Sequence, residues 1–391
     1  VYLGLPLFSD DDAKRQLGMD VTELIIAQLL YLEFEDPEKP IYFYTTFILF
    51  CLSTYVSLWD HFLLTESFCC SAFIFSTYFL FSNSKRKLFF SGIFLTWSIF
   101  LRPIMAPLMI LFCCFILLKN VKFFQQIKSY NWKNLTIFLI GFILIDGAWI
   151  LRNYKKYNNI YPLTKSIYYS GAEKSYIVPL NNFIISFGGS IVHWNPGAEI
   201  TFFKPPSKYI KKKIIANLPE HIYTNEFNYD SLVNVKHLIR EIESDKTLPS
   251  RKHNINLILT EKLNRYTSSI KAEKSILFSI RSRLKILKTY FIHSGTYNLF
   301  NKLSSELNMF EFSIKIFYSL LYLFVIISGF LGCLLLLQMG IKNIQYLTIS
   351  ASALYLALSY PVLLGLDEYR YFVPGYPLLL LTSIFTIIQC H

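Results

Sequence analysis

Long apolar stretches separated by short polar turns make up most of this sequence, apart from one polar segment in its middle. Six stretches approach or exceed the roughly 17 to 25 residues that a membrane-spanning helix needs. They are residues 41–58, 62–81, 135–151, 312–338, 344–364 and 372–388. Two shorter stretches, 88–101 and 104–118, are separated by Arg102-Pro103, which predicts a tight helical hairpin or two short spans with a break. The pattern predicts a mainly α-helical, polytopic membrane bundle of about seven to nine spans.

Basic residues in the short loops predict how the bundle is oriented. The turn Ser84-Lys85-Arg86-Lys87 is strongly basic, and the loop 119–133 holds four lysines. Because such loops stay in the cytoplasm, both are expected on that side. The polar middle segment and the turn Asp367-Glu368-Tyr369-Arg370-Tyr371 then fall on the external side.

The same reasoning divides the chain into four parts. Residues 1–40 form an N-terminal segment, 41–151 a first transmembrane bundle, 152–310 an external domain and 311–391 the C-terminal transmembrane helices. Within the external domain, apolar residues recur at 276, 280, 284 and 287 among basic ones. That helix is expected either to lie on a lipid surface or to pack on its own domain. The chain begins with Val1 rather than Met, so we expect residues missing upstream or an unconventional start.

Composition supports a membrane protein and argues against other classes. Of 391 residues, 53% are hydrophobic, 17% aromatic and only 16% charged, whereas a soluble domain carries about 25% charged residues. The seven cysteines lie in or beside apolar stretches, where they behave as small hydrophobes, and no Cys/His spacing predicts a zinc site. The net charge of +12 is expected from cytoplasmic loops and contacts with anionic membrane lipids, not from nucleic-acid binding.

Polar residues at the ends of the apolar stretches suggest a site. Ionisable groups near a bilayer are costly, so they are more often functional or paired than incidental. The predicted orientation places all of them on the external side, and they comprise Asp60, His61, Glu66, Arg102, Arg152, Glu368, Arg370 and Tyr371.

This set of residues suits an anionic headgroup carried on a lipid. An arginine offers a planar fork of donors that matches a phosphate, and a carboxylate can take a proton from an attacking hydroxyl or amine. Transfer of a sugar from a polyprenyl phosphate needs both, and the chain contains no P-loop or G-x-G-x-x-G motif.

Each residue also has a simpler structural interpretation. Glu66 is expected to pair with Arg102 across helices, Arg152 to reach for lipid headgroups, and Glu368 to pair locally with Arg370. Asp60-His61 would be an interfacial loop, and the run Asp10-Asp11-Asp12 a frayed acidic terminus.

Four motifs, in order, resemble a known family. They are Leu63-Leu64-Thr65-Glu66-Ser67, then Gly92 with Leu101-Arg102-Pro103, then Trp149-Ile150-Leu151-Arg152-Asn153-Tyr154, and finally Glu368-Tyr369-Arg370-Tyr371-Phe372-Val373-Pro374 with Tyr376-Pro377. This order is similar to that in bacterial polytopic glycosyltransferases of the GT-C type, relatives of dolichyl-phosphate-mannose–protein mannosyltransferases and of the aminoarabinose transferase of lipid A. In the closing motif Tyr369 precedes Arg370, which departs from the family's order.

The resemblance implies an enzyme of the bacterial cytoplasmic membrane that works at its periplasmic face. It would move a sugar, with inversion, from a polyprenyl-phosphate donor to a lipid, glycan or protein acceptor, and no cofactor or metal site is evident. Its catalytic aspartate would follow a first span that is not clear here, so either Asp10, Asp11 or Asp12 stands in or the residue lies upstream. Glu66 would also serve the catalytic site. Arg102, Arg152 and Arg370 would bind the donor phosphate, with Asp60, His61, Glu368 and Tyr371 supporting them.

Two other classes remain as alternatives. A transporter or flippase for a lipid-linked saccharide would hold the same phosphate without cleaving a bond. A non-catalytic envelope membrane protein is favoured if the catalytic aspartate is absent.

Overall fold

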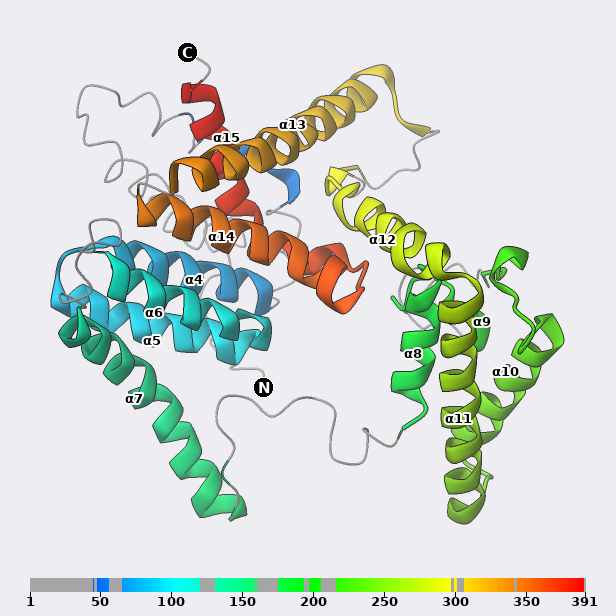
Figure 1. Cartoon of the computed structure of the whole chain (residues 1–391). Helices are drawn as coiled ribbons and strands as arrows, with labels where there is room; N and C mark the ends of the chain where they lie inside the picture. The colour runs from blue at the N-terminus through cyan, green and yellow to red at the C-terminus, as the bar shows by residue number, and fades with distance from the viewer. Residues whose placement is uncertain are drawn as a thin grey trace, which may run out of the picture. The chain divides into compact units, whose positions relative to one another are not determined.

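The structure is a computed structural model, and it describes residues 45, 48–55, 65–119, 131–158, 160, 175–192, 197–204, 216–296, 299–300, 306–340 and 343–389. These residues are mostly helical and include no strand, which confirms the predicted fold class at that level. They belong to two compact units (Figure 1). Unit 1 comprises Val1–Thr164, His293–Ser359 and Arg370–His391, and unit 2 comprises Lys165–Ile292 and Tyr360–Tyr369. The four-part division by membrane side stays a prediction.

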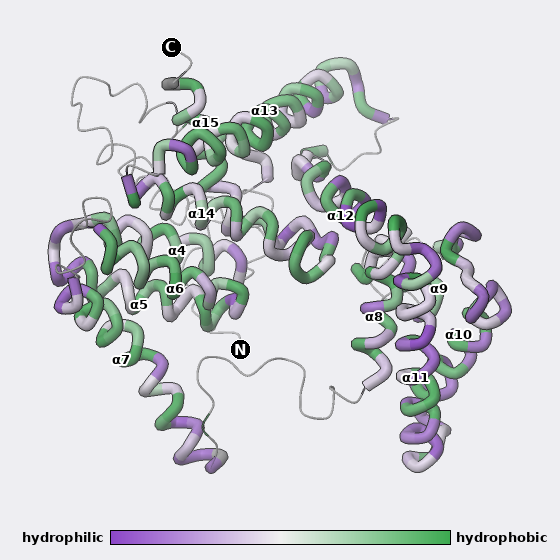
Figure 2. Tube along the Cα trace, viewed as in Figure 1, coloured by the Kyte–Doolittle hydropathy of each residue, from purple (hydrophilic) through white to green (hydrophobic). Residues whose placement is uncertain are grey.

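Three helices are long and apolar enough to cross a membrane, namely Trp132–Lys156, Met309–Gly340 and Ile344–Leu364. Shorter apolar helices cover Thr65–Phe81, Pro103–Leu118, Ile177–Ser186 and Tyr376–Ile387. Figure 2 shows the hydrophobic residues concentrated along helices α4 to α6, within residues 65–118, and α13 to α15, within residues 309–389. Only residues 45 and 48–55 of the predicted 41–58 span are described. The count of spans expected from the sequence therefore stays a prediction.

Serine side chains join α4 (Thr65–Phe81) to α5 (Lys85–Leu101). The hydroxyl of Ser76 donates to the carbonyl of Ser91 at 2.7 Å, and the hydroxyl of Ser91 donates to the carbonyl of Ser76 at 2.8 Å. Helices in lipid gain little from hydrophobic association, so small residues and interhelical hydrogen bonds supply much of the contact.

A break follows α5 at the position that the sequence predicts. Arg102 is extended, with φ −145° and ψ 103°, and the 3₁₀ turn Pro103–Met105 leads into α6 (Ala106–Leu118). The proline ring clashes with a helical conformation of the residue before it, so α5 ends at Leu101. The phenolic hydroxyl of Tyr355, on α14 (Ile344–Leu358), donates to the carbonyl of Ile104 at 2.7 Å and ties this turn to the C-terminal helices.

The C-terminal helices α13 (Met309–Gly340) and α15 (Tyr376–Gln389) pack closely. The hydroxyl of Thr382 donates to the carbonyl of Gly329, and that of Thr386 to the carbonyl of Ser328, both at 2.8 Å. A Cβ atom on Gly332 would collide with the carbonyl oxygen of Thr382. Glycine at this position therefore allows the two backbones to come into contact.

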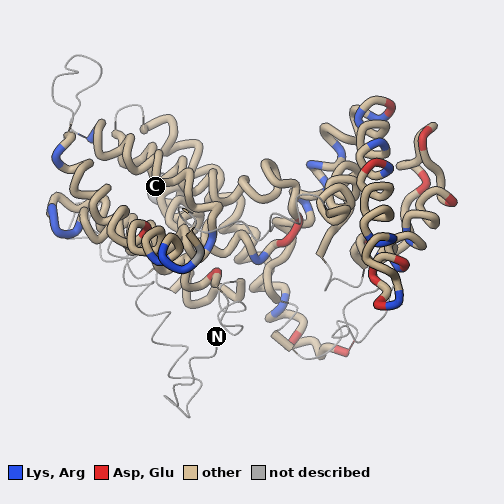
Figure 3. Tube along the Cα trace, turned by 90° about the horizontal axis from the view of Figure 1, so that it is seen from below, with Lys and Arg blue, Asp and Glu red and all other residues tan. Residues whose placement is uncertain are grey.

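Unit 2 has its own aromatic core. The ring of Phe183, on α8 (Ile177–Ser186), contacts the rings of Phe187, Phe203, Phe227 and Tyr266 with centroids 5.3 to 6.3 Å apart. The remaining helices of this unit are α9 (Ile200–Phe203), α10 (Tyr229–Glu243), α11 (Pro249–Glu273) and α12 (Ser282–Phe291). Charged residues are dense along α10 to α12 and sparse along α4 to α6 and α13 to α15 (Figure 3).

A π-helical turn sets the face that α12 buries. The turn Leu277–Arg281 precedes α12, and Leu277, Ile286 and Tyr290 are buried. Ile276, Ile280 and Leu284, which recur at helical spacing in the sequence, are exposed together. A π turn adds one residue to the helical repeat, so the buried positions Leu277 and Ser282 are five residues apart across it.

We expect Gly332→Val to destabilise unit 1 by about 1–3 kcal/mol, because the added side chain forces α13 and α15 apart. Chemical unfolding in detergent micelles measures the loss. The neighbouring change Leu331→Val, on a side chain that is 50% exposed, is the control and should have a small effect. Equal losses in the two variants would contradict the close contact.

Candidate functional site

A buried carboxylate forms the centre of the candidate site in unit 1. Glu66 is the second residue of α4, and its side chain is 1% exposed. The first turn of a helix favours negative charge because its backbone N–H groups carry partial positive charge. This local effect is small beside the cost of burying a charge, so Glu66 requires cationic partners.

Two arginines from distant parts of the chain supply these partners. Arg102, at the break after α5, forms an ion pair through its Nη2 atom with Oε1 of Glu66. Arg370 lies on the 3₁₀ turn Tyr369–Phe372, and its Nε atom is 3.6 Å from the same carboxylate oxygen. The structure therefore contains the Glu66–Arg102 pairing that the sequence suggested, with a second arginine added to it.

The ring of Tyr371 lies beside both arginines. The guanidinium carbon of Arg102 is 4.8 Å from the ring centroid, and that of Arg370 is 5.1 Å from it. Nη2 of Arg370 also donates to the Tyr371 hydroxyl at 3.4 Å. Cation–π attraction to one ring offsets part of the repulsion between two like charges held close together.

In the cluster of Glu66, Arg102, Arg370 and Tyr371, two guanidinium groups share one carboxylate. The arginine side chains are 19% and 21% exposed, whereas that of Glu66 is 1% exposed. Nε of Arg102 is buried without a hydrogen-bond partner. An anion with several oxygens, such as a phosphate, matches both the charge and the fork of donors.

Of the other residues that the sequence selected, two are described and five lie outside the described residues. Arg152 is exposed on α7 (Trp132–Tyr157), where its guanidinium lies 5.0 Å from the Trp149 ring centroid and contacts the Asn153 side chain at 3.2 Å. These contacts are on its own helix rather than with Glu66. Glu368 is buried and belongs to unit 2. Asp10, Asp11, Asp12, Asp60 and His61 lie outside the described residues.

Unit 2 contains a second polar cluster, which the sequence reasoning missed. The carboxylate of Glu199 accepts hydrogen bonds from the Ser190 backbone N–H at 2.7 Å and from Nζ of Lys285 at 2.8 Å. Burial raises the pKa of the Asp367 carboxyl above its ordinary 3.8, while a hydrogen bond with the Ser190 side chain acts the other way. The members of this cluster are scattered along the chain, so no local sequence motif marks them.

The described residues contain no group of three or more His, Cys, Asp or Glu side chains that could hold a metal ion.

Comparisons with known proteins assign no family to the chain. No family model matches it, and no solved structure matches it. Two curated relatives, each a putative ATP-dependent Clp protease proteolytic subunit-like protein, match over 44 residues. The one from Synechococcus elongatus is 82% identical there and the one from Synechocystis sp. 75%. The match covers 11% of this chain, and the chain spans about a fifth of these relatives, 19% and 20%.

We expect Glu66→Ala to destabilise unit 1 by about 3 kcal/mol, because two guanidinium groups lose their shared counter-ion. The coupling is measured by chemical unfolding of Glu66→Gln, Arg102→Gln and the double variant. Removing both partners leaves no charge of this pair unpaired, so the double variant should lose less stability than the two single losses added together. Strictly additive losses would show that the ion pair contributes no coupling.

Asp367 should make unit 2 less stable as the pH rises. Its folded-state pKa is above the ordinary value of 3.8, so the folded state holds this proton to higher pH than the unfolded state does. The contribution of this proton to the free energy of unfolding is complete below about pH 4. It is lost as the pH rises through the raised pKa of Asp367. Asp367→Asn should flatten this part of the pH profile of the unfolding midpoint, whereas Asp245→Asn, at an exposed site, should not. An unchanged slope in Asp367→Asn would contradict the assignment.

Proposed function

We propose that this protein is a multi-pass membrane glycosyltransferase of the GT-C type, with about seven to nine spans. It moves a sugar from a polyprenyl-phosphate donor to a lipid, glycan or protein acceptor at the periplasmic face of a bacterial cytoplasmic membrane. The observation that carries the proposal is the convergence of Arg102 and Arg370 on one buried carboxylate. The three helices able to cross a membrane support a lipid-embedded substrate.

The proposed reaction is a direct displacement at the sugar. An acceptor hydroxyl or amine attacks the anomeric carbon, and the bond between that carbon and the phosphate oxygen breaks. The bonding electrons leave with the phosphate, and a carboxylate takes the proton of the acceptor. Arg102 and Arg370 would stabilise the negative charge that grows on the departing phosphate.

Glu66 acts in this proposal by positioning. Its carboxylate holds both arginines within reach of one anion, so a donor phosphate would meet two guanidinium groups at one place. The sequence-based candidates for the proton acceptor are Asp10, Asp11 and Asp12.

We also propose that unit 2 and α7 contact the membrane surface. Ile276, Ile280 and Leu284 form an exposed apolar stripe on a helix that also carries Arg281 and Lys288. That combination suits the boundary between headgroups and acyl chains. Arg152, stacked on Trp149 near the end of α7, suits the same boundary and would guide the donor headgroup toward the site.

Replacing either Arg102 or Arg370 with Ala should lower transfer at least 100-fold, because each removes a group that stabilises the leaving phosphate. Transfer is measured in proteoliposomes supplied with a radiolabelled polyprenyl-phosphate sugar. Arg265→Ala is the matched control, since Arg265 is 61% exposed and pairs only with surface acids of unit 2. Size-exclusion chromatography and circular dichroism establish that each variant is folded.

Wild-type turnover in folded Arg102→Ala or Arg370→Ala would refute the site. Wild-type protein that moves the labelled donor across the bilayer without transferring sugar would favour the transporter. If the wild type does neither, the non-catalytic envelope protein becomes the better description.

A further inference from the structure

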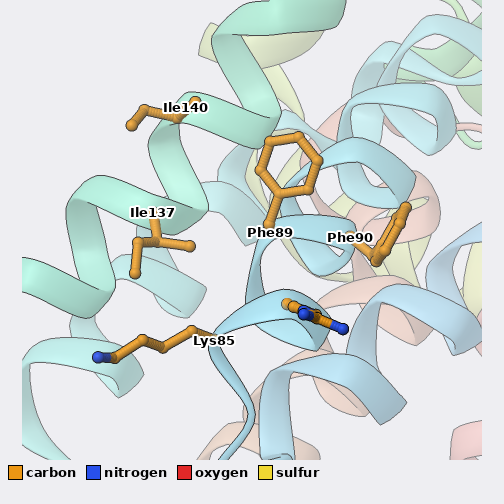
Figure 4. Close-up of a pocket in the computed structure, with 6 residues that line it drawn as sticks. Lys85, Phe89, Phe90, Ile137 and Ile140 are labelled. Carbon is orange, nitrogen blue, oxygen red and sulfur yellow. The ribbon is translucent and has the colours of Figure 1, made fainter.

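An apolar groove lies between α5 and α7 within unit 1. Its volume is about 340 Å³, which falls in the range of small-molecule sites. Figure 4 shows side chains of both helices facing it, and the residues that line it are Lys85, Arg86, Phe89, Phe90, Ile137 and Ile140.

The groove follows from how the two helices cross. A Cβ on Gly92 would collide with the carbonyl of Phe138, and one on Gly141 with the carbonyl of Phe89, so the backbones touch there. The Thr96 hydroxyl adds a bond across this contact, donating to the carbonyl of Phe142 at 3.4 Å. The groove lies on the N-terminal side of Gly92 and Gly141, between the first turns of α5 and the residues around Ile137 and Ile140 of α7.

The apolar walls of the groove are partly exposed at the surface of unit 1. The side chains of Phe90 and Ile140 are 46% and 51% exposed. Only 28% of the most apolar part of α7 is buried inside the protein. An exposed apolar surface of this kind on a helix able to span a membrane is suited to contact with acyl chains.

Positive charge is concentrated at one end of the groove. Lys85 and Arg86 are exposed in the first turn of α5, and no Asp or Glu is among the lining residues. The N-terminus of α5 adds partial positive charge, because Ser84 makes no side-chain cap to its first N–H groups. The sequence also places this turn on the cytoplasmic side, where anionic lipid headgroups meet basic residues.

We propose that this groove binds an anionic phospholipid, with an acyl chain along Phe89, Phe90, Ile137 and Ile140 and its phosphate at Lys85 and Arg86. A zwitterionic lipid would fill the apolar part equally well but would bring its own cation to the basic end. The site is independent of sugar transfer, because Lys85 and Arg102 lie at opposite ends of α5, about 25 Å apart at 1.5 Å per residue.

The test uses the full chain, purified in detergent and depleted of lipid, with phosphatidylglycerol, phosphatidylcholine or inorganic phosphate added. Native mass spectrometry counts retained lipid, and thermal unfolding reports stabilisation. We expect phosphatidylglycerol to be retained and to raise the unfolding midpoint, with weaker effects of phosphatidylcholine and none of inorganic phosphate. Lys85→Gln/Arg86→Gln should bind phosphatidylglycerol at least tenfold more weakly, and Ile140→Trp should lower retention of both lipids.

Lys155→Gln/Lys156→Gln, at the C-terminal end of α7, is the charge-matched control and should bind as the wild type does. Equal retention of the two lipids by the wild type, or unchanged binding in Lys85→Gln/Arg86→Gln, would overturn the proposal. If inorganic phosphate raised the unfolding midpoint as much as phosphatidylglycerol does, Lys85 and Arg86 would bind a free anion rather than a lipid. A dimer that Ile140→Trp dissociates would show that a second copy of the chain fills the groove.

Discussion

The burial of a single carboxylate constrains more of unit 1 than any other feature. An unpaired charge at the position of Glu66 would cost several kcal/mol, so the fold must bring cations to it from elsewhere in the chain. Arg102 reaches it from the break that Pro103 imposes on α5, and Arg370 from a short 3₁₀ turn before α15. One side chain thus connects the N-terminal helices to the turn before α15, although the Lys165–Ile292 part of unit 2 lies between them in the sequence.

Close contact between helix backbones also holds together the N-terminal helices of unit 1 and, separately, its C-terminal helices. In an apolar solvent, hydrophobic burial does little to hold helices together, and short polar side chains and glycines replace it. The reciprocal bonds of Ser76 and Ser91 join α4 to α5, and the Thr382 hydroxyl joins α15 to Gly329 on α13. Rigid packing of this kind keeps the ends of the helices fixed, so Arg102 and Arg370 are held near Glu66 without a dedicated domain.

Local rules predicted the features that depend on neighbouring residues, and failed where distant residues decide. The helical class and the break at Arg102-Pro103 follow from apolar length and proline geometry. The spacing of Ile276, Ile280 and Leu284 left open whether they face lipid or their own domain, and their exposure needed the structure. The contacts of Glu199 with Ser190 and Lys285 depend on tertiary packing and leave no mark in the local sequence. Tyr371 was selected as a supporting residue, but its place beside both arginines needed the structure.

The two anion sites proposed for unit 1 differ in a way that bears on their roles. At the C-terminal end of α5, the cations meet a buried carboxylate, so an incoming phosphate must compete with Glu66 for the same donors. Such competition would favour an anion whose negative charge increases during the reaction. A more weakly charged anion would not draw the two arginines away from Glu66. At the N-terminal end, Lys85 and Arg86 line an apolar groove with no acid, which favours steady binding of a lipid headgroup. The two proposals therefore place a site that would exchange its ligand and a site that would retain one at opposite ends of a single helix.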